Sequence, residues 1–451
     1  SLGNGGLQLQ TTSQEFQLPS GLTVKDVLQT LSSTFVIASD DQLYAAGRNT
    51  YGELGIGNRD MQRVPVRFQL PVGLSAVSVH VLPRDSYDFE DVTYVLASDG
   101  QVYSAGSNYY GEMGYGGAQE HVTTPVRFQL PVGVNALEVS PHENTVYVRA
   151  SDGKVYCSGW NSNGELGDGT TTVRTSPVVF PLPGGVSAVK LATYAGLYQH
   201  TAAVIGSDGK LYVAGQNYSG ELGIGTTGAV QSTPVVFPLP GGVTATAAVI
   251  GDSYIGVTGS DGQMYFSGRN TRGGFGNGSA VNTSVPVKFQ LPVGLTVVTF
   301  YPHVWDGLTM ILASDGQVYG SGYNSNGNLG TGDTINRSTP VRYPLPVGVN
   351  ATKVVATVEI VMVLGTDGNV YVNGENPEGQ LGDGTTSTPV NTEVYPLPVG
   401  LSATDIAIPT RDYAYSAHVL ANGRVFGSGN NDGGWLGDGT RTSSSTPTEM
   451  V

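Results

Sequence analysis

The sequence has only one cysteine, Cys157, and few charged residues. A single thiol excludes a disulfide within the chain, and the alternating pattern around Cys157 predicts a small, buried side chain. Charged residues make up 13% of the chain, and the net charge is −15. A chain this acidic repels phosphate backbones, so we expect no nucleic-acid partner. No apolar run is long enough to span a bilayer, and we expect no membrane insertion.

Long helix-favouring runs and a signal peptide are also lacking. Glycine accounts for 65 of the 451 residues, and together with 25 prolines this composition predicts many short strands joined by turns. The chain starts at Ser1, without a methionine and inside a repeat phrase, Leu2-Gly3-Asn4-Gly5. We interpret this start as a processed N-terminus or as a segment of something longer. We favour processing and secretion, and therefore an extracellular or cell-surface location.

What the sequence does contain is a repeat, seen most clearly in residues 150–170. Asp-Gly between two alternating apolar runs predicts a hairpin, and the following Gly-x-Asn-x-x-Gly-Glu-Leu-Gly-x-Gly predicts a tight, glycine-built loop. Eight such turns recur, at Asp40-Asp41, Asp99-Gly100, Asp152-Gly153, Asp208-Gly209, Asp261-Gly262, Asp315-Gly316, Asp367-Gly368 and Asn422-Gly423. The first of them lacks glycine, so we expect it to be strained or of another type.

Each repeat has room for four short strands. In the third repeat they are predicted at Asn135–Ser140, Thr145–Ala150, Lys154–Ser158 and Pro177–Leu182. Four antiparallel strands with short connections form one blade of a propeller. A fixed period of this length indicates a repeat architecture. We therefore predict an all-β protein that folds as a single β-propeller of four-stranded antiparallel blades.

The outer-strand phrase occurs nine times for eight complete repeats. The surplus copy lies in residues 1–23, where Glu15, Phe16, Gln17 and Leu18 match residues 67–70, and residues 24–451 form the predicted propeller. We expect the surplus strand either to close the ring or to pair with a neighbouring molecule as an assembly strand. The alternative is that Ser445–Val451 is merely a tail.

The phrase Ser-Asp-Gly-x-Val-Tyr-x-x-Gly-x-Asn-x-x-Gly-x-Leu-Gly-x-Gly resembles the repeat of the regulator of chromosome condensation superfamily, over nearly the whole chain. The resemblance implies a β-propeller, usually seven-bladed; eight complete repeats favour eight blades here, with seven plus an exchanged blade as the alternative. Members of that family include an exchange factor for a small GTPase, a plant ultraviolet receptor and secreted bacterial propellers that inhibit β-lactamase. The acidic, tryptophan-poor chain is closest in character to the secreted bacterial members.

No catalytic arrangement emerges from the sequence, and we expect neither enzymatic activity nor a cofactor. The six histidines lack metal-ligand spacing, and Glu53, Glu112, Glu165 and Glu221 occupy one repeat position, which favours a structural role. Carboxylates from different blades could still meet in space, so a lyase or glycosidase stays an open alternative. One acidic cluster is a weak Ca²⁺ candidate, against a solvated loop, and consists of Asp85, Asp88, Glu90 and Asp91.

Binding is expected on the face that carries the variable loops, where aromatic side chains give a large contact area at low entropic cost. The candidates are Tyr87, Tyr109, Tyr110, Trp160, Tyr194, Tyr198, Tyr254, Trp305, Tyr323 and Tyr413. The alternative is that these rings pack between blades. Possible glycan acceptors are Asn217, Asn277, Asn282, Asn336 and Asn350.

These observations predict a secreted, non-catalytic propeller with a structural or adhesive role. We expect its partner to be itself, in an extracellular filament built through the terminal strand. One alternative is a soluble module that binds a protein or glycan, or inhibits an enzyme, through the tyrosine-rich face. A regulator resembling a guanine-nucleotide exchange factor is a further alternative that fits the acidic chain poorly.

Overall fold

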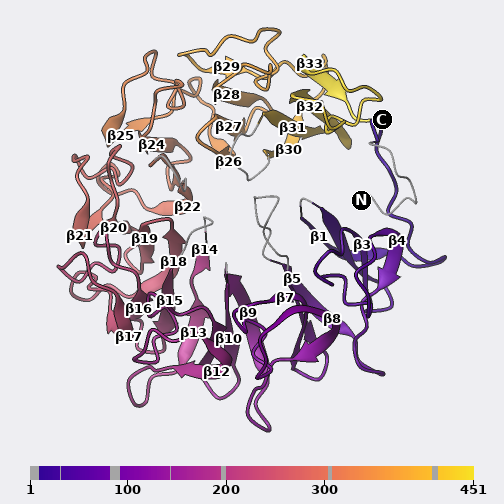
Figure 1. Ribbon diagram of the computed structural model, residues 1–451. Helices are drawn as coiled ribbons and strands as arrows, with labels where there is room; N and C mark the ends of the chain where they lie inside the picture. Colours follow the sequence, from indigo (N-terminus) through magenta and orange to yellow (C-terminus); the bar gives the residue numbers. More distant parts are fainter. Residues whose placement is uncertain are drawn as a thin grey trace.

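The computed structural model describes residues 10–30, 32–81, 92–142, 144–194, 200–302, 307–408 and 415–451. In this part of the chain every regular element is a strand, and eight antiparallel sheets follow one another around a ring (Figure 1). We number the sheets as blades 1 to 8 in chain order. The sequence-based predictions of an all-β propeller and of eight blades are confirmed, and the seven-bladed alternative is rejected.

Every blade is built from four consecutive antiparallel strands, running from the ring axis outward. The inner strands are β1 (Val24–Gln29), β5 (Ala76–Val81), β9 (Ala136–His142), β13 (Ala188–Leu191), β18 (Ala245–Gly251), β22 (Val297–Pro302), β26 (Ala351–Ala356) and β30 (Ala403–Ala407). The second strands are β2 (Ser33–Ala38), β6 (Val92–Ala97), β10 (Thr145–Ala150), β15 (Thr201–Gly206), β19 (Tyr254–Gly259), β23 (Thr309–Ala313), β27 (Ile360–Gly365) and β31 (Ser416–Ala421).

The third and outer strands complete the blades. The third strands are β3 (Leu43–Gly47), β7 (Val102–Asn108), β11 (Val155–Gly159), β16 (Leu211–Gly215), β20 (Met264–Gly268), β24 (Val318–Gly322), β28 (Val370–Gly374) and β32 (Arg424–Gly429). The outer strands are β4 (Gln62–Arg67), β8 (Gln119–Arg127), β12 (Arg174–Phe180), β17 (Gln231–Val236), β21 (Thr283–Lys288), β25 (Arg337–Arg342), β29 (Glu393–Val394) and β33 (Ser444–Glu449). The short β14 (Thr193–Tyr194) leaves blade 4 and pairs in parallel with β18 of blade 5.

The turn between the second and third strands is held by an aspartate and a tyrosine four residues later. In blade 3, Asp152 accepts a hydrogen bond from the backbone N–H of Lys154 and another, of 2.8 Å, from the hydroxyl of Tyr156. The same pair recurs in seven blades, as Asp40–Tyr44, Asp99–Tyr103, Asp152–Tyr156, Asp208–Tyr212, Asp261–Tyr265, Asp315–Tyr319 and Asp367–Tyr371. Blade 8 has Asn422 and Phe426 instead, and its turn is a tighter one.

The next residue of the turn adopts a left-handed backbone conformation, which explains the glycine. Gly100 and Gly153 have φ angles of 73° and 79°. In blade 1 the position is held by Asp41, whose φ is 60°. A non-glycine residue in this region carries strain, as we expected for this turn.

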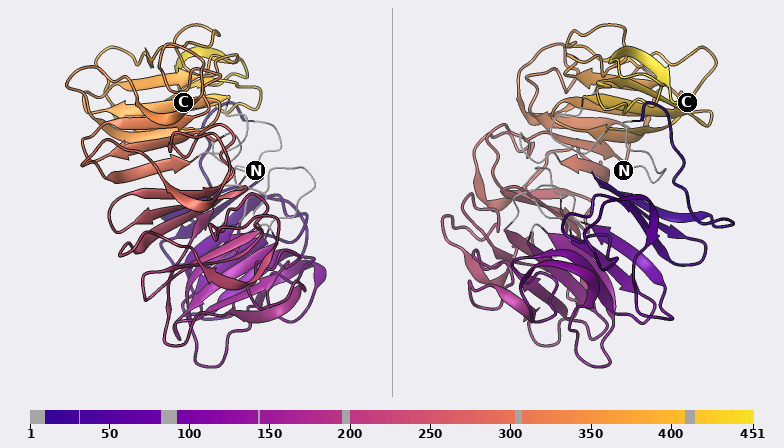
Figure 2. Two further views of the ribbon diagram at one scale, coloured as in Figure 1. Left: turned by 90° about the vertical axis from the view of Figure 1, so that its left-hand side faces the viewer. Right: turned by 45° about the vertical axis from the view of Figure 1, so that its right-hand side comes forward.

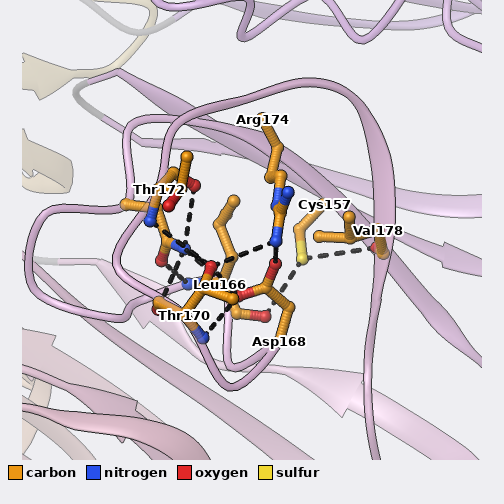
Figure 3. Close-up of polar contacts among 8 residues, drawn as sticks. Cys157, Leu166, Asp168, Thr170, Thr172, Arg174 and Val178 are labelled. Carbon is orange, nitrogen blue, oxygen red and sulfur yellow. Dashed lines mark hydrogen bonds and ion pairs between the residues drawn. The ribbon is translucent and has the colours of Figure 1, made fainter.

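The loop between the third and outer strands is organised around one buried asparagine. Figure 3 shows the loop of blade 3, with the labelled residues Leu166, Thr170 and Thr172 close together. In blade 3 the side-chain oxygen of Asn161 accepts from the N–H of Leu166 at 2.9 Å, and its amide donates to the carbonyls of Thr170 and Thr172. The glutamate of the repeat has a similar role, because Glu165 accepts from the N–H of Asn163. Equivalent contacts of Glu53, Glu112 and Glu221 confirm the structural role predicted for this position. Cys157 is buried beneath the same loop, as predicted.

Hydrophobic cores form between blades rather than within them. Each core joins the outer three strands of one blade to the inner three of the next; that between blades 1 and 2 contains Phe35, Leu43, Phe68, Val79 and Tyr103. Seven such cores connect the eight blades in sequence. Among the described residues no such core joins blade 8 to blade 1.

Replacing the buried loop asparagine should destabilise the fold. Asn161→Ala leaves a backbone N–H and two carbonyls without their partner, so we expect a loss of about 3 kcal/mol in the free energy of unfolding, measured by urea denaturation. Asn163→Ala in the same loop is the matched control, because its side chain accepts only a 3.4 Å hydrogen bond from Tyr218. Equal losses for the two variants would contradict this role of Asn161.

The Asp–Tyr pairs predict a loss of stability in alkali. Burial, the hydrogen bond and the adjacent carboxylate raise the pKa of Tyr103, Tyr156, Tyr212, Tyr265 and Tyr371 to about 12. The unfolded value is about 10. Because the folded pKa is the higher one, this contribution is complete below pH 10 and is lost as the pH rises through 12. Denaturation midpoints measured from pH 9 to 12 should fall, and Tyr156→Phe should make the fall shallower.

Candidate functional site

Neighbouring blades touch through a glycine of each loop and the outer strand of the next blade. A Cβ on Gly111 would lie 2.5 Å from the Cα of Thr175, and one on Gly164 would lie 2.6 Å from the Cα of Ser232. The same outer-strand residue accepts a hydrogen bond from a later glycine of the loop, as Thr175 does from Gly116. Only glycine permits so close an approach of two backbones. Each loop therefore holds the outer strand of the following blade.

The loop of blade 8 holds residues 10–18 of the N-terminus, which we call the bridging segment. The N–H of Gly439 donates to the carbonyl of Thr11 at 2.5 Å, and the N–H of Ser13 donates to Val451 at 2.7 Å. Thr12 forms an antiparallel bridge with Asp438, as Asn391 does with Thr331 at the boundary between blades 6 and 7. The bridging segment thus takes the place of an outer strand that would follow blade 8.

The bridging segment crosses the boundary between blade 8 and blade 1, which we call the seam. In Figures 1 and 2 the indigo chain leaves blade 1 and runs along the rim of the ring to the yellow, C-terminal blade. The described part of the chain places no hydrophobic core here. The surplus strand predicted from the sequence is therefore used within the same chain, at the seam.

The inner strand at the seam exposes apolar side chains that other blades bury. Val24 and Val27 of β1 are 57% and 59% exposed, whereas Ala76 and Val79 at the same positions of β5 are 5% and 6% exposed. The outer part of blade 1 is different, because Ala46 is buried. The seam is thus uncovered on its inner side.

Blade 8 exposes the opposite wall of the seam. Trp435, which takes the place of the buried loop glutamate, is 59% exposed, and Leu420 of β31 is exposed too. Val425 is partly exposed, although its equivalents Val102 and Val155 are fully buried. Both walls of the seam are therefore apolar, and neither is covered as in the other boundaries.

The outer strand of blade 1 is not shaped for the loop of blade 8. At the position where Thr11 meets that loop, other outer strands carry Thr123, Thr175, Ser232, Ser284, Ser338, Val390 and Ser445. Thr123 lies five residues before Phe128, and the residue five positions before Phe68 in blade 1 is Arg63. The side chain of Arg63 is exposed. The long side chain of an arginine does not fit in the close contact between the loop glycine and the outer strand. The bridging segment therefore fits the loop of blade 8 better than β4 does.

Several predicted aromatic side chains of the loop face instead link adjacent blades. Tyr110 packs edge-on against Trp160 of the next blade, with ring centroids 4.7 Å apart. Tyr323 lies under the guanidinium of Arg272 from the preceding blade, at 4.5 Å. Tyr109 is 44% exposed and is the best placed for a surface contact, and Tyr194 is half-buried in β14.

Two predicted sites need correction. Tyr254 is not on the surface: it begins β19 and is buried in the core between blades 5 and 6. Asn217 is the buried loop asparagine of blade 4, and its amide donates to Thr226, so a glycan cannot be attached while the loop is folded. Of the other sequons, Asn277 is partly buried and Asn282, Asn336 and Asn350 are exposed.

Other predicted residues fall outside the described part of the chain. They are the aromatic candidates Tyr87, Tyr198, Trp305 and Tyr413 and the acidic cluster Asp85, Asp88, Glu90 and Asp91. Among the described residues no three His, Cys, Asp or Glu side chains form a group that could hold a metal ion. No helix of the described chain is long and apolar enough to cross a membrane.

Sequence analysis missed the seam, although signals for it were present. Trp435 interrupts a repeat position that is otherwise small or polar, and Arg63 interrupts one that is otherwise mostly Ser or Thr. Such departures from a repeat mark the places where its neighbours differ. Val24 and Val27 carry no signal of their own, because they match the inner-strand pattern.

Docking of the bridging segment should depend on Gly434. A Cβ there would overlap the carbonyl oxygen of Gln10. We expect Gly434→Ala to speed hydrogen exchange at the amides of Ser13 and Gly439 about tenfold, which corresponds to about 1.4 kcal/mol. Gly423→Ala is the matched control, because Gly423 has a similar φ of 78° but no atom within 4 Å of a Cβ. Equal exchange in the two variants would contradict the close contact.

Comparison with known proteins agrees with the repeat seen in the structure. The model of the regulator of chromosome condensation (RCC1) repeat matches residues 40–81, 152–204 and 315–364. The ultraviolet-B receptor UVR8 of Arabidopsis thaliana is 26% identical over 353 residues, which cover 78% of this chain and 77% of the receptor. The E3 ubiquitin-protein ligase HERC2 of Homo sapiens is 25% identical over 362 residues, which cover 79% of this chain but 7% of the ligase.

Solved structures support the same fold. Human WBSCR16 has a TM-score of 0.54 at 19% identity, with 75% of this chain and 86% of that chain covered. Yeast RCC1 (Prp20), solved bound to Kap60, has a TM-score of 0.51 at 19% identity, with 73% and 77% covered. At these identities the likeness concerns the fold alone. The repeat matches, the eight blades and the sequence relatives together support assignment of the chain to the RCC1-type β-propeller superfamily.

Proposed function

We propose that this protein is a non-catalytic structural or adhesive propeller that assembles with copies of itself outside the cell. Proteins with this fold serve as protein-interaction modules, and the proposal specifies the partner and the contact. The bridging segment of one copy would bind the loop of blade 8 of a second copy, and repetition of this exchange would build a filament. The extracellular location rests on the low charge and on the abundance of small polar residues.

The observation that carries the proposal is that the bridging segment binds blade 8 through local backbone contacts, which any copy of the chain can provide. It binds blade 8 through backbone hydrogen bonds of Thr11 and Ser13, and it spans a seam at which the described residues form no hydrophobic core. A second copy offers the same loop with the same bonds. Exchange of a terminal element between identical chains is a low-cost route to assembly. Exchange that does not close on itself gives an open chain of molecules.

Relatives support a protein partner in general terms. Yeast RCC1 (Prp20) was solved bound to Kap60, and Prp20p was studied for its binding to Gsp1p and histones. HERC2 is named as a ubiquitin ligase, but this chain matches only 7% of its length. These relatives favour protein binding over catalysis for the propeller itself.

A second candidate is a module that binds a foreign protein or inhibits an enzyme through the loop face. The exposed ring of Tyr109, beside His121 at 6.3 Å, favours it. Recovery of one stoichiometric foreign protein with the purified chain would favour this candidate over self-assembly.

Strand exchange can be detected with two cysteine variants mixed in solution. Paired residues of an antiparallel bridge have Cα atoms about 4.5–5.5 Å apart, which suits a disulfide. Thr12→Cys chains mixed with Asp438→Cys chains should therefore form disulfide-linked dimers under oxidation, seen on non-reducing gels. Cys157 should not interfere, because it is buried and burial raises the pKa of its thiol. Position 438 tolerates change, since other blades carry Ile56, Ile224 or Thr331 there.

The control uses the equivalent loop position of blade 7. Thr12→Cys mixed with Asp383→Cys should give no dimer, because the loop of blade 7 holds β33 and not the bridging segment. Dimers in both mixtures would reflect random oxidation. A cross-link within single chains of the double variant Thr12→Cys, Asp438→Cys, together with none in the mixture, would overturn exchange. Monomers alone in electron micrographs of the unmodified protein would overturn assembly.

A further inference from the structure

The seam has the place of a ninth blade, of which the described residues supply only the outer strand. The bridging segment lies on the loop of blade 8 as an outer strand does, and it then enters β1 through Leu18-Pro19-Ser20-Gly21. Leu70-Pro71-Val72-Gly73 leads from the outer strand of blade 1 into β5 in the same way, with Leu74 bonded to Pro71 as Leu22 is to Pro19. By this register the bridging segment follows blade 8 and precedes blade 1. No described strand occupies the inner three places of this position.

The inner edge of the bridging segment is available for pairing. In the blades, the N–H at the position of Phe16 donates to the third strand, as Phe128 does to Val102 and Met450 does to Val425. The N–H of Phe16 has no such bond among the described residues. A backbone N–H of this kind, on an extended segment with an open edge, favours addition of a strand.

The surfaces of blade 8 and blade 1 that face the seam correspond to the surfaces that pack together at the seven other boundaries. The seven inner boundaries show what each wall receives: inner strands such as β5 pack Ala76 and Val79 against Phe35 and Leu43 of the preceding blade. Val24 and Val27 of blade 1 therefore fit the second and third strands of a preceding blade. Leu420 and Val425 of blade 8 fit the inner strand of a following one. The missing unit is thus defined on both sides.

Blade 1 is a poor substitute for the missing unit. For blade 1 to close directly on blade 8, β4 would have to displace the bridging segment and bring Arg63 to the contact with Gly434. The seven other boundaries place Ser, Thr or Val there. The chemistry of the seam therefore favours an added unit over direct closure.

We infer that the seam is an acceptor site for a unit of three antiparallel strands that carries the same kind of repeat. The incoming unit would place its inner strand against blade 8, its second and third strands against Val24 and Val27, and its third strand along Phe16. It would complete a ninth blade and cover Trp435. This inference does not depend on exchange of the bridging segment, because the place exists whichever copy supplies that segment.

A polypeptide of residues 345–374 tests the inference, because it contains the inner three strands of blade 7 with their leading turn. Added to the full chain, it should bind saturably and shift the fluorescence of Trp435 to the blue as the indole is covered. Trp435→Phe should remove the shift but not the binding heat. Val27→Glu should weaken binding at least about tenfold, because a buried carboxylate would lack a partner. Val132→Glu, at a fully exposed turn tip away from the seam, should leave binding unchanged.

A second variant tests the fit without the solubility problems of a free peptide. A copy of residues 345–374 appended after Val451 continues the repeat in register, since Met450 corresponds to Tyr343. It should raise the melting temperature and protect β1 from hydrogen exchange, and the same residues in scrambled order should do neither. An appended unit that stays protease-sensitive, with an unchanged melting temperature, would overturn the site.

Discussion

The close approach of a loop glycine to the next outer strand is the contact on which this ring depends. It needs a glycine on one side, a small residue on the other, and a loop that presents the glycine in one fixed position. The buried asparagine provides the third condition, since its amide binds both ends of the loop. The hydrophobic cores between blades follow from this contact, because it sets how near each sheet lies to the next. The fold and the docking of the bridging segment therefore depend on the same local contact.

The two terminal blades show what happens where the repetition stops. Blade 1 has an apolar inner strand, but its outer strand carries Arg63 and does not contact the loop of blade 8. Blade 8 keeps the docking loop and uses it to hold the N-terminus, but it lacks the Asp–Tyr pair and exposes Trp435. Blades 1 and 8 thus depart from the repeat at different positions, and in each blade these positions lie at the seam.

Sequence alone was sufficient for the regular part of the molecule and insufficient where spatial neighbours decide. In the third repeat the inner strand begins at Ala136, within one residue of the predicted Asn135, because alternation and the Leu-Pro-x-Gly turn fix it locally. The role of Glu165 followed from its repetition. Tyr254 was misplaced because a loop and the first residue of a strand look alike without the neighbouring blade. Asn217 matched a sequon because the motif ignores burial. The exposure of Val24 depends on an absent neighbour, which no local pattern reveals.

The identity of the blade boundaries has a consequence for how such rings change over time. Each of the seven boundaries between consecutive blades uses the same contacts in the same register, so a duplicated or deleted repeat would leave the remaining contacts intact and alter only the circumference. The sequence of a single repeat therefore does not determine the number of blades. It is set by how many blades the segment that closes the ring can accommodate. A strand that spans an incomplete blade position allows the ring to form with different numbers of repeats.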